Sequence, residues 1–128
     1  MNCLIVESNA ALGRLWQRHL ERLNISVVLA HSGEQARNLI LTYLYDVIVL
    51  NLMLPEGAAL GVADLAQFRQ PDANVVFVTD TTFFSDGSIF RHSPNARTFI
   101  QSTTPPADLA AIVQHYGRAN HAREEPRD

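Results

Sequence analysis

Short runs of consecutive apolar residues recur along the chain and constrain its fold more than any other feature. Each run has the length of one strand, and together they cover residues 3–6, 26–30, 47–50, 75–78 and 98–101. Strands that are apolar on both faces are typical of a parallel sheet covered by helices on each side. Segments with helical spacing separate most of the runs. We therefore predict an α/β domain, built on a doubly wound sheet of about five parallel strands.

Apolar spacing and capping residues predict the helices between these strands. Ser8 and Asn9 are both candidate caps for a first helix. Ser32 and Gln35 have the spacing of a capping box ahead of a second helix. The apolar faces expected for these two helices are Leu12, Leu15, Trp16, Leu20 and Leu23, and then Ala36, Leu39, Ile40, Tyr43 and Leu44.

The second half of the chain is less regular. A weak helix is expected at 59–69, and Pro106 opens a last helix with apolar residues up to Tyr116. Residues 81–95 mix aromatic residues with serine, aspartate, glycine and proline, and the pattern assigns no element there. Little apolar material follows Gly117, so we expect a domain over 1–116 and a flexible tail over 117–128.

The composition excludes several classes of function. All ten basic residues are arginine, so no lysine is present for Schiff-base chemistry or for a P-loop. The single cysteine, Cys3, excludes an internal disulfide and a multi-cysteine zinc site. A net charge of −3 disfavours nucleic acid as a partner. No apolar run is long enough to span a membrane and no secretion leader is evident, so we expect a cytoplasmic protein without a membrane partner.

Four segments stand out when they are read in order. They are Leu-Ile-Val-Glu-Ser at 4–8, Asp-Val-Ile-Val-Leu-Asn-Leu-Met-Leu-Pro at 46–55, Val-Phe-Val-Thr at 76–79 and Asn-Ala-Arg-Thr-Phe-Ile at 95–100. Together they resemble the response-regulator receiver domain over residues 2–116. The resemblance implies a three-layer sandwich of the flavodoxin or CheY-like type, with five parallel strands in the order 2-1-3-4-5.

The resemblance also implies a phosphoacceptor pocket. In receivers, an aspartate after the third strand accepts a phosphoryl group, and two acidic residues after the first strand help it to hold Mg²⁺. A threonine or serine and a lysine, after the fourth and fifth strands, contact the phosphoryl group. The corresponding positions in this sequence are Asn51 for the acceptor, Glu7 and Ser8 for the acidic pair, Thr79 for the hydroxyl and Ser102 for the lysine.

These replacements predict that the pocket is not phosphorylated. The amide of Asn51 is a poor nucleophile toward phosphorus. Mg²⁺ prefers charged oxygen ligands, of which only Glu7 remains, so we expect Mg²⁺ binding to be lost and no cofactor to be held. Asp80 adds a carboxylate that would repel a phosphoryl group. We expect a neutral pocket, locked in one state by hydrogen bonds among its polar residues, Asn51, Ser8, Thr79 and Ser102.

The predicted function is that of a stand-alone pseudo-receiver, a phosphorylation-independent protein-interaction and regulatory module in two-component signalling, and not an enzyme. Its partner would be a histidine kinase, another regulator or a second copy in a homodimer. Candidate partner-surface residues are Phe83, Phe84 and Phe90, together with Phe99, which matches the aromatic switch position of receivers. Packing in the core is the alternative role for each of them. Replacing Phe84 or Phe90 with serine tests the partner surface, because self-association or partner capture should weaken.

Other functions remain open at this level. A small-molecule sensor would have a ligand-sized cavity near Asn51 and Thr79, and an atypical phosphoacceptor would use Asp80. Glu7 and Asp80 could also form an acid–base pair for catalysis. The favoured alternative is that one of the two is a solvated acid and the other caps a helix. A metal site is also disfavoured, because no two histidines have i, i+4 spacing; surface positions are expected for His19, His31, His92, His115 and His121.

Overall fold

The computed structural model describes residues 1–79 and 96–124, and it confirms the predicted α/β architecture. Five parallel strands form one sheet in the order β2-β1-β3-β4-β5. The strands are β1 (Asn2–Val6), β2 (Ser26–Ala30), β3 (Val47–Asn51), β4 (Asn74–Thr79) and β5 (Ala96–Gln101). The helices are α1 (Ala10–Glu21), α2 (Gly33–Thr42), a short 3₁₀ turn η1 (Pro55–Gly57), α3 (Ala58–Arg69) and α5 (Pro106–Glu124).

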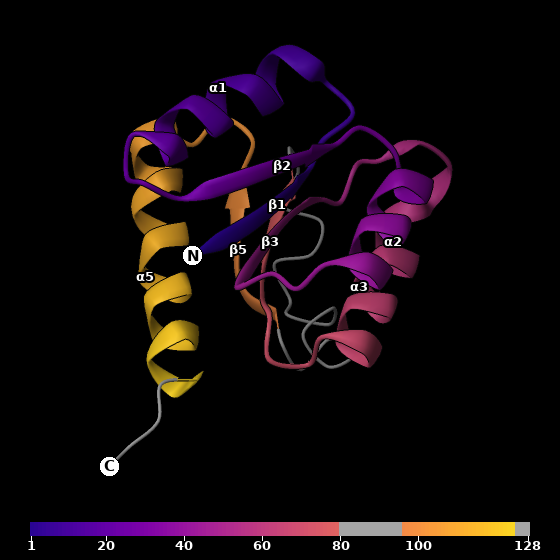
Figure 1. Ribbon diagram of the computed structural model, residues 1–128. Coiled ribbons are helices and arrows are strands. Elements are labelled where there is room, and N and C mark those ends of the chain that lie inside the picture. The colour runs from indigo at the N-terminus through magenta and orange to yellow at the C-terminus, as the bar shows by residue number, and fades with distance from the viewer. Residues whose placement is uncertain (80–95, 125–128) are drawn as a thin grey trace.

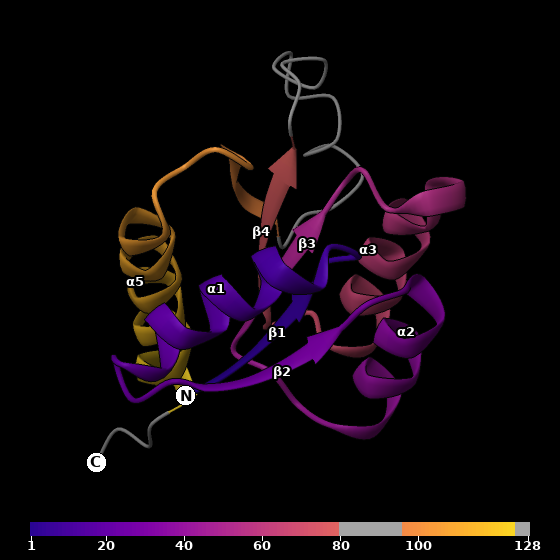
Figure 2. The ribbon, with the colours of Figure 1, turned by 90° about the horizontal axis from the view of Figure 1, so that it is seen from above.

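Helices cover both faces of the sheet, as all-apolar strands require. Helices α1 and α5 lie against one face, while α2 and α3 lie against the other (Figure 1; Figure 2). The helices on each face also contact each other. Figure 2 shows the strands running in sequence from β2 at one edge, through β1 and β3, to β4. Within the described residues, no helix is both long enough and apolar enough to cross a membrane.

A hydrophobic core fills the space between the sheet and its helices on each face of the sheet. Trp16 and Leu20 of α1 pack with Leu109 and Val113 of α5 on one face. On the other face, apolar residues of α2 and α3 pack over the side chain of Phe77. Burying one large apolar side chain contributes about 1.5–3 kcal/mol. The central strands β1, β3 and β4 are therefore the most strongly stabilised by burial, and the residues at their ends have fixed positions.

The predicted caps begin the first two helices. The side chain of Asn9 accepts a hydrogen bond from the N–H of Leu12 at 3.1 Å, so Asn9, and not Ser8, caps α1. The hydroxyl of Ser32 accepts from the N–H of Gln35 at 3.1 Å. The side-chain oxygen of Gln35 accepts a hydrogen bond from the N–H of His31 at 2.8 Å. In a standard capping box the donor is the N–H of the cap residue itself, which here is Ser32.

Some predicted helical faces were too long. Helix α1 ends at Glu21 and α2 ends at Thr42, so Leu23, Tyr43 and Leu44 lie beyond the last turns. All three side chains are exposed, Leu44 by 78%. Periodicity alone did not predict these helix ends, because apolar residues continue past each of them.

The predicted end of regular structure at Tyr116 was also wrong. The backbone of α5 continues through Gly117 to Glu124. A Cβ atom at Gly117 would lie 2.3 Å from the sulfur of Met1, so this glycine allows a close approach between α5 and the N-terminus. A tail was predicted from Gly117 because little apolar material follows it, and the sequence does not show the contact with Met1. Residues 125–128 lie outside the described residues.

Cys3 is expected to be inert toward thiol reagents in the folded protein. Its side chain is fully buried in β1. Burial, with a further contribution from the negative charge of Asp46, raises the pKa of the Cys3 thiol. At pH 8, Cys3 should therefore react with a disulfide reagent only when the chain unfolds globally, and labelling should be complete in denaturant. Rapid labelling of the native chain would contradict this burial.

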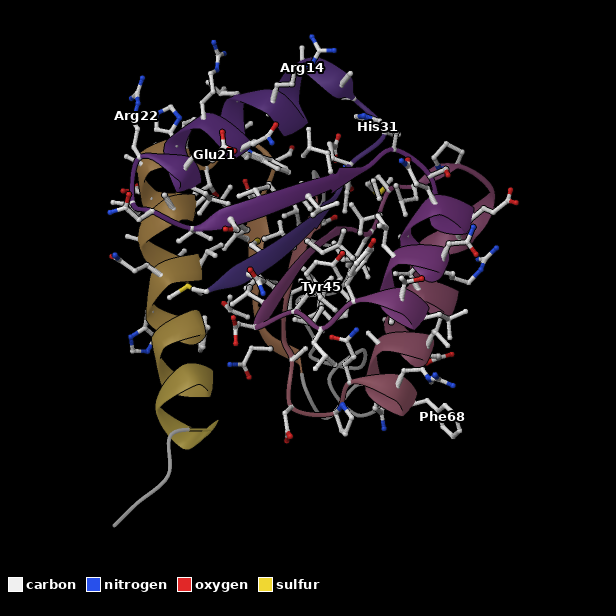
Figure 3. All side chains as sticks on the ribbon, in the orientation of Figure 1. Arg14, Glu21, Arg22, His31, Tyr45 and Phe68 are labelled. Carbon is white, nitrogen blue, oxygen red and sulfur yellow. The ribbon has the colours of Figure 1, made fainter. Side chains whose placement is uncertain are left out.

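Tyr45 carries a buried hydroxyl that has no hydrogen-bond partner among the described residues. The residue follows α2 and belongs to the core on the α2 and α3 face (Figure 3). Burial also raises the pKa of Tyr45. Since burying an unpaired hydroxyl is unfavourable, Tyr45→Phe should raise the free energy of unfolding by about 1 kcal/mol. Urea unfolding measures this change, and a loss of stability would instead reveal a partner for the hydroxyl.

Candidate functional site

The carboxyl ends of the central strands bring together polar side chains from distant parts of the sequence. Glu7 directly follows β1, while Asn51 and Thr79 are the last residues of β3 and β4. Their positions are fixed by the parallel register, which pairs Asn51 with Val78. The N–H of Leu52 also donates to the carbonyl of Val78 at 2.8 Å. In doubly wound sheets, functional crevices lie at this edge.

Asn51 is held by two hydrogen bonds that define the orientation of its amide. The backbone N–H of Met53 donates to Oδ1 at 2.8 Å. The other amide atom, Nδ2, donates to Oε2 of Glu7 in a short contact. Because a backbone N–H can only donate, Oδ1 must face Met53 and the NH₂ group must face Glu7. The last residue of β3 therefore presents a hydrogen-bond donor to the carboxylate of Glu7.

Glu7 is a buried acid with both carboxylate oxygens engaged, and only 3% of the residue is exposed. Oε1 accepts from the N–H of Asn9 at 3.3 Å, at the start of α1. The positive end of a helix dipole and an amide donor both stabilise a carboxylate. Of the two roles expected for Glu7 and Asp80, a solvated acid and a capping acid, Glu7 therefore has the one at the start of a helix, and it is not solvated. The site contains a buried acid whose neighbours are neutral N–H groups.

A small cavity of about 160 Å³ opens beside these bonds. It is lined by Glu7, Leu12, Asn51, Met53 and Ser102. Pockets that bind metabolites usually measure about 300–1,000 Å³. The cavity formed by the described residues is smaller than that range and has the carboxylate of Glu7 in its wall.

The structure brings together most of the predicted pocket residues, but not all of them. Thr79 is buried at the end of β4, and its carbonyl accepts from the N–H of Ser102 at 2.9 Å. Ser8 is exposed, so the predicted hydrogen-bond network that includes Asn51 and Ser8 was wrong. The side chain that bonds to Asn51 is Glu7. Asp80 lies outside the described residues.

The predicted partner surface is described only at Phe99. Its ring stacks on Phe77, with centroids 5.2 Å apart, and packs against the core on the α2 and α3 face. Phe99 remains half-buried. Phe83, Phe84 and Phe90 lie outside the described residues, as does the segment 81–95.

The histidines that the structure describes do not form a cluster, although Nδ1 of His31 lies 3.3 Å from the backbone carbonyl of Glu7. Nδ1 of His19 lies 3.0 Å from the carbonyl of Leu15 in its own helix. His31 and His115 are exposed. Among the residues described, no three His, Cys, Asp or Glu side chains form a group that could hold a metal ion. The side chains of His92 and His121 are outside the description.

Met53 contributes to the site although it was not among the predicted site residues. Its backbone N–H fixes the amide of Asn51. An asparagine that accepts from an N–H two residues later forms an Asx turn, which is common where a strand passes into a loop. Asn51 followed by Leu-Met-Leu-Pro has that signature, so the sequence did contain a signal for this contact.

Comparison with curated proteins gives a partial match. The transcriptional regulatory protein DltR from Streptococcus agalactiae serotype III (strain NEM316) is 32% identical over 79 residues, which cover 62% of this chain and 35% of DltR. DltR from a serotype V strain of the same species matches over the same shares. The chain thus spans about a third of the length of the curated relatives it matches.

Solved structures share the fold at low sequence identity. A CheY-like receiver domain protein from Methanospirillum hungatei JF-1 has a TM-score of 0.86 and 16% identity, covering 95% of this chain and 97% of that chain. The N-terminal domain of a response regulator/sensory box/GGDEF 3-domain protein from Carboxydothermus hydrogenoformans has a TM-score of 0.83 and 23% identity, covering 98% of this chain and 100% of that chain. Residues 3–114 match the family described as the response regulator receiver domain. The chain therefore belongs to the response regulator receiver domain family, whose members act in two-component signalling.

Proposed function

We propose that the chain is a pseudo-receiver, a regulatory module that binds a signalling partner without being phosphorylated. The partner would be a histidine kinase or another regulator in the cytoplasm, or a second copy of the chain. Recognition would then depend on the surface of a fold held in one state, and the module would have no enzymatic activity. Nucleic acid and membranes are not among the proposed partners.

One observation carries this proposal: the amide of Asn51 donates a hydrogen bond to Glu7. In an active receiver, an ionised carboxylate occupies the place of Asn51 and attacks phosphorus. A neutral amide is a poor nucleophile. Its oxygen also accepts from the N–H of Met53, a contact that fixes the orientation of the amide.

The same contacts support the proposed loss of Mg²⁺, because the donor set does not fit this ion. Mg²⁺ requires several hard oxygen ligands in octahedral geometry. Among the described residues that line the cavity, Glu7 is the one carboxylate, and both of its oxygens accept from N–H groups. The NH₂ group of Asn51 turns partial positive charge toward the oxygen that a cation would need.

A small-molecule sensor and an acceptor at Asp80 are the alternative functions. The cavity volume of about 160 Å³ argues against a metabolite of ordinary size. The second alternative is phosphorylation at Asp80. Treatment with a small phosphodonor tests phosphorylation at Asp80 and at Asn51 in the same experiment.

The proposal is tested by incubating the purified chain with acetyl phosphate and Mg²⁺ and measuring its intact mass. We expect no gain of a phosphoryl group, at Asp80 or elsewhere. A stoichiometric gain that disappears in alkaline hydroxylamine would identify an acyl phosphate, and would contradict the proposal.

A variant with the receiver residues restored provides the matched control. Ser8→Asp, Asn51→Asp and Ser102→Lys together return the second acid, the nucleophile and the ammonium group to the positions where receivers have them. We expect this triple variant to gain a phosphoryl group under conditions in which the unmodified chain does not. That contrast would place the inactivity in these three positions, since the fold and the reagents are the same.

A further inference from the structure

The carboxylate of Glu7 is a buried negative charge that no cation balances within the part of the chain that the structure describes. Its two oxygens accept hydrogen bonds from neutral groups, the N–H of Asn9 and the amide of Asn51. The ring of His31 bonds to the backbone carbonyl of Glu7 and not to its carboxylate. Buried carboxylates in proteins are normally paired with a positive charge or with a metal ion. A cationic partner for Glu7 is therefore missing from the described residues.

The carboxylate of Glu7 can accept further hydrogen bonds. An ionised carboxylate offers about four lone-pair sites, and the two N–H groups occupy only part of this capacity. Glu7 also lines the cavity of about 160 Å³ at the end of the sheet. Ser102 lines the same cavity, and its hydroxyl is a second acceptor. The cavity therefore offers a charged and a neutral oxygen acceptor.

The remaining walls of the cavity are suited to an alkyl chain. Leu12 of α1 and Met53, which follows β3, line it beside the polar groups. Met53 is 50% exposed, while Leu12 and Ser102 are half-buried, so the cavity opens to the surface. A side chain that enters here would lay its methylene groups against Leu12 and Met53 and carry its end to Glu7. Lysine has this division between an apolar stem and a charged end.

We infer that this cavity receives the ammonium group of a lysine side chain from a signalling partner. The chain contains no lysine, so neither the chain nor a second copy of it can supply this group. Among the described residues, no arginine lines the cavity either. The ammonium group would donate to the carboxylate of Glu7 and to the hydroxyl of Ser102, and it would balance the buried charge. The inference rests on the proposed function, because a cavity that takes up a phosphoryl group would have a different occupant.

An ammonium group fits this cavity better than Mg²⁺ or a guanidinium group. Mg²⁺ requires several oxygen ligands in octahedral geometry, whereas an ammonium group requires only hydrogen-bond acceptors for its N–H donors. A guanidinium group pairs best with both oxygens of one carboxylate, and in Glu7 each oxygen already accepts from an N–H. The volume of about 160 Å³ is below the range of metabolite pockets but admits the end of one side chain.

An NMR titration tests the binding directly, with Nα-acetyl-lysine methylamide as the probe for a partner's lysine. We expect saturable shifts at the backbone amides of Glu7, Leu12 and Met53, with a dissociation constant in the millimolar range. Nα-acetyl-norleucine methylamide is the matched probe, because it has the same carbon chain without the ammonium group. It should bind at least about tenfold more weakly, since it makes no hydrogen bond to the carboxylate.

Variants of the cavity locate the binding site. Ser102→Leu fills the cavity and leaves both hydrogen bonds of Glu7 in place, so it should weaken binding of the lysine probe about tenfold or more. Thr103→Leu is the matched control, because Thr103 is exposed and does not line the cavity, and it should leave the dissociation constant unchanged. Glu7→Gln removes the charge and should weaken binding at least as much as Ser102→Leu. If the glutamine variant does not fold, the comparison of Ser102→Leu with Thr103→Leu still decides.

The inference is overturned if the lysine probe causes no saturable shift, if the norleucine probe binds as tightly, or if Ser102→Leu binds the lysine probe as well as Thr103→Leu does. Tighter binding of putrescine at the same amides would also overturn it, because the ligand would then be a free diamine and not a partner's lysine. A phosphoryl group gained from acetyl phosphate would instead contradict the proposed function. The two failures are distinguishable, since neither the lysine probe nor the norleucine probe can donate a phosphoryl group.

Discussion

Asn51→Asp should lower the free energy of unfolding by about 3 kcal/mol at neutral pH. The substitution removes the N–H donor that faces Glu7 and replaces it with a second carboxylate in a buried position. Breaking a buried, charge-assisted hydrogen bond and leaving like charges in contact typically costs about 3–5 kcal/mol. Urea unfolding of the variant and of the unmodified chain measures the difference.

A charge exchange provides the control for that experiment. In the double variant Glu7→Gln with Asn51→Asp, the amide and the carboxylate change places. Residue 7 can still accept from the N–H of Asn9 and now donates to residue 51, which can still accept from Met53. The double variant should recover most of the lost stability. If Asn51→Asp were as stable as the unmodified chain, the bond between Asn51 and Glu7 would not hold the pocket together.

Gln70→Leu should cause a loss of similar size, again about 3 kcal/mol. The buried amide of Gln70 makes three hydrogen bonds at the end of α3. Its oxygen accepts from the N–H of Tyr45, and its nitrogen donates to the carbonyls of Ile40 and Tyr43. Leucine would leave three backbone groups unpaired in a buried region, each at a cost of about 1–3 kcal/mol.

The loss at Gln70 should be specific to its amide. Gln67→Leu, one turn earlier in α3, is the matched control and should change the stability by less than about 0.5 kcal/mol. Thermal or urea unfolding of both variants makes the comparison. Equal stabilities would show that the chain between α2 and β3 does not depend on Gln70.

The strands could be predicted from sequence more fully than the contacts between elements. Consecutive apolar residues from Val47 to Leu50 are possible only where both faces are covered, so the pattern predicted a central strand. The role of Gln70 could not be predicted, because nothing local shows that its amide reaches the end of α2. The role of Gly117 was missed for the same reason: its neighbour, Met1, lies at the other end of the chain.

The candidate site was predicted in its residues but not in its bonds. The resemblance to receivers identified Glu7, Asn51 and Thr79, because the ends of parallel strands meet at one edge. It did not predict that Glu7 becomes the partner of Asn51, since the buried acid depends on the start of α1 as well as on β3. The groove beside β2 that Val28, Tyr43 and Leu44 line was not predicted either, because it forms where α2 ends earlier than its periodicity indicates.

On the proposed function, the pocket at Asn51 accepts neither Mg²⁺ nor a phosphoryl group. The decisive experiment is a titration of the isotopically labelled chain with Mg²⁺ and beryllofluoride, followed by amide NMR spectra. We expect no saturable shift at the amides of Glu7, Asn51 and Thr79. Saturable shifts at these three residues would refute the proposed pseudo-receiver, and would show that the end of β3 still binds the ligands of an active receiver.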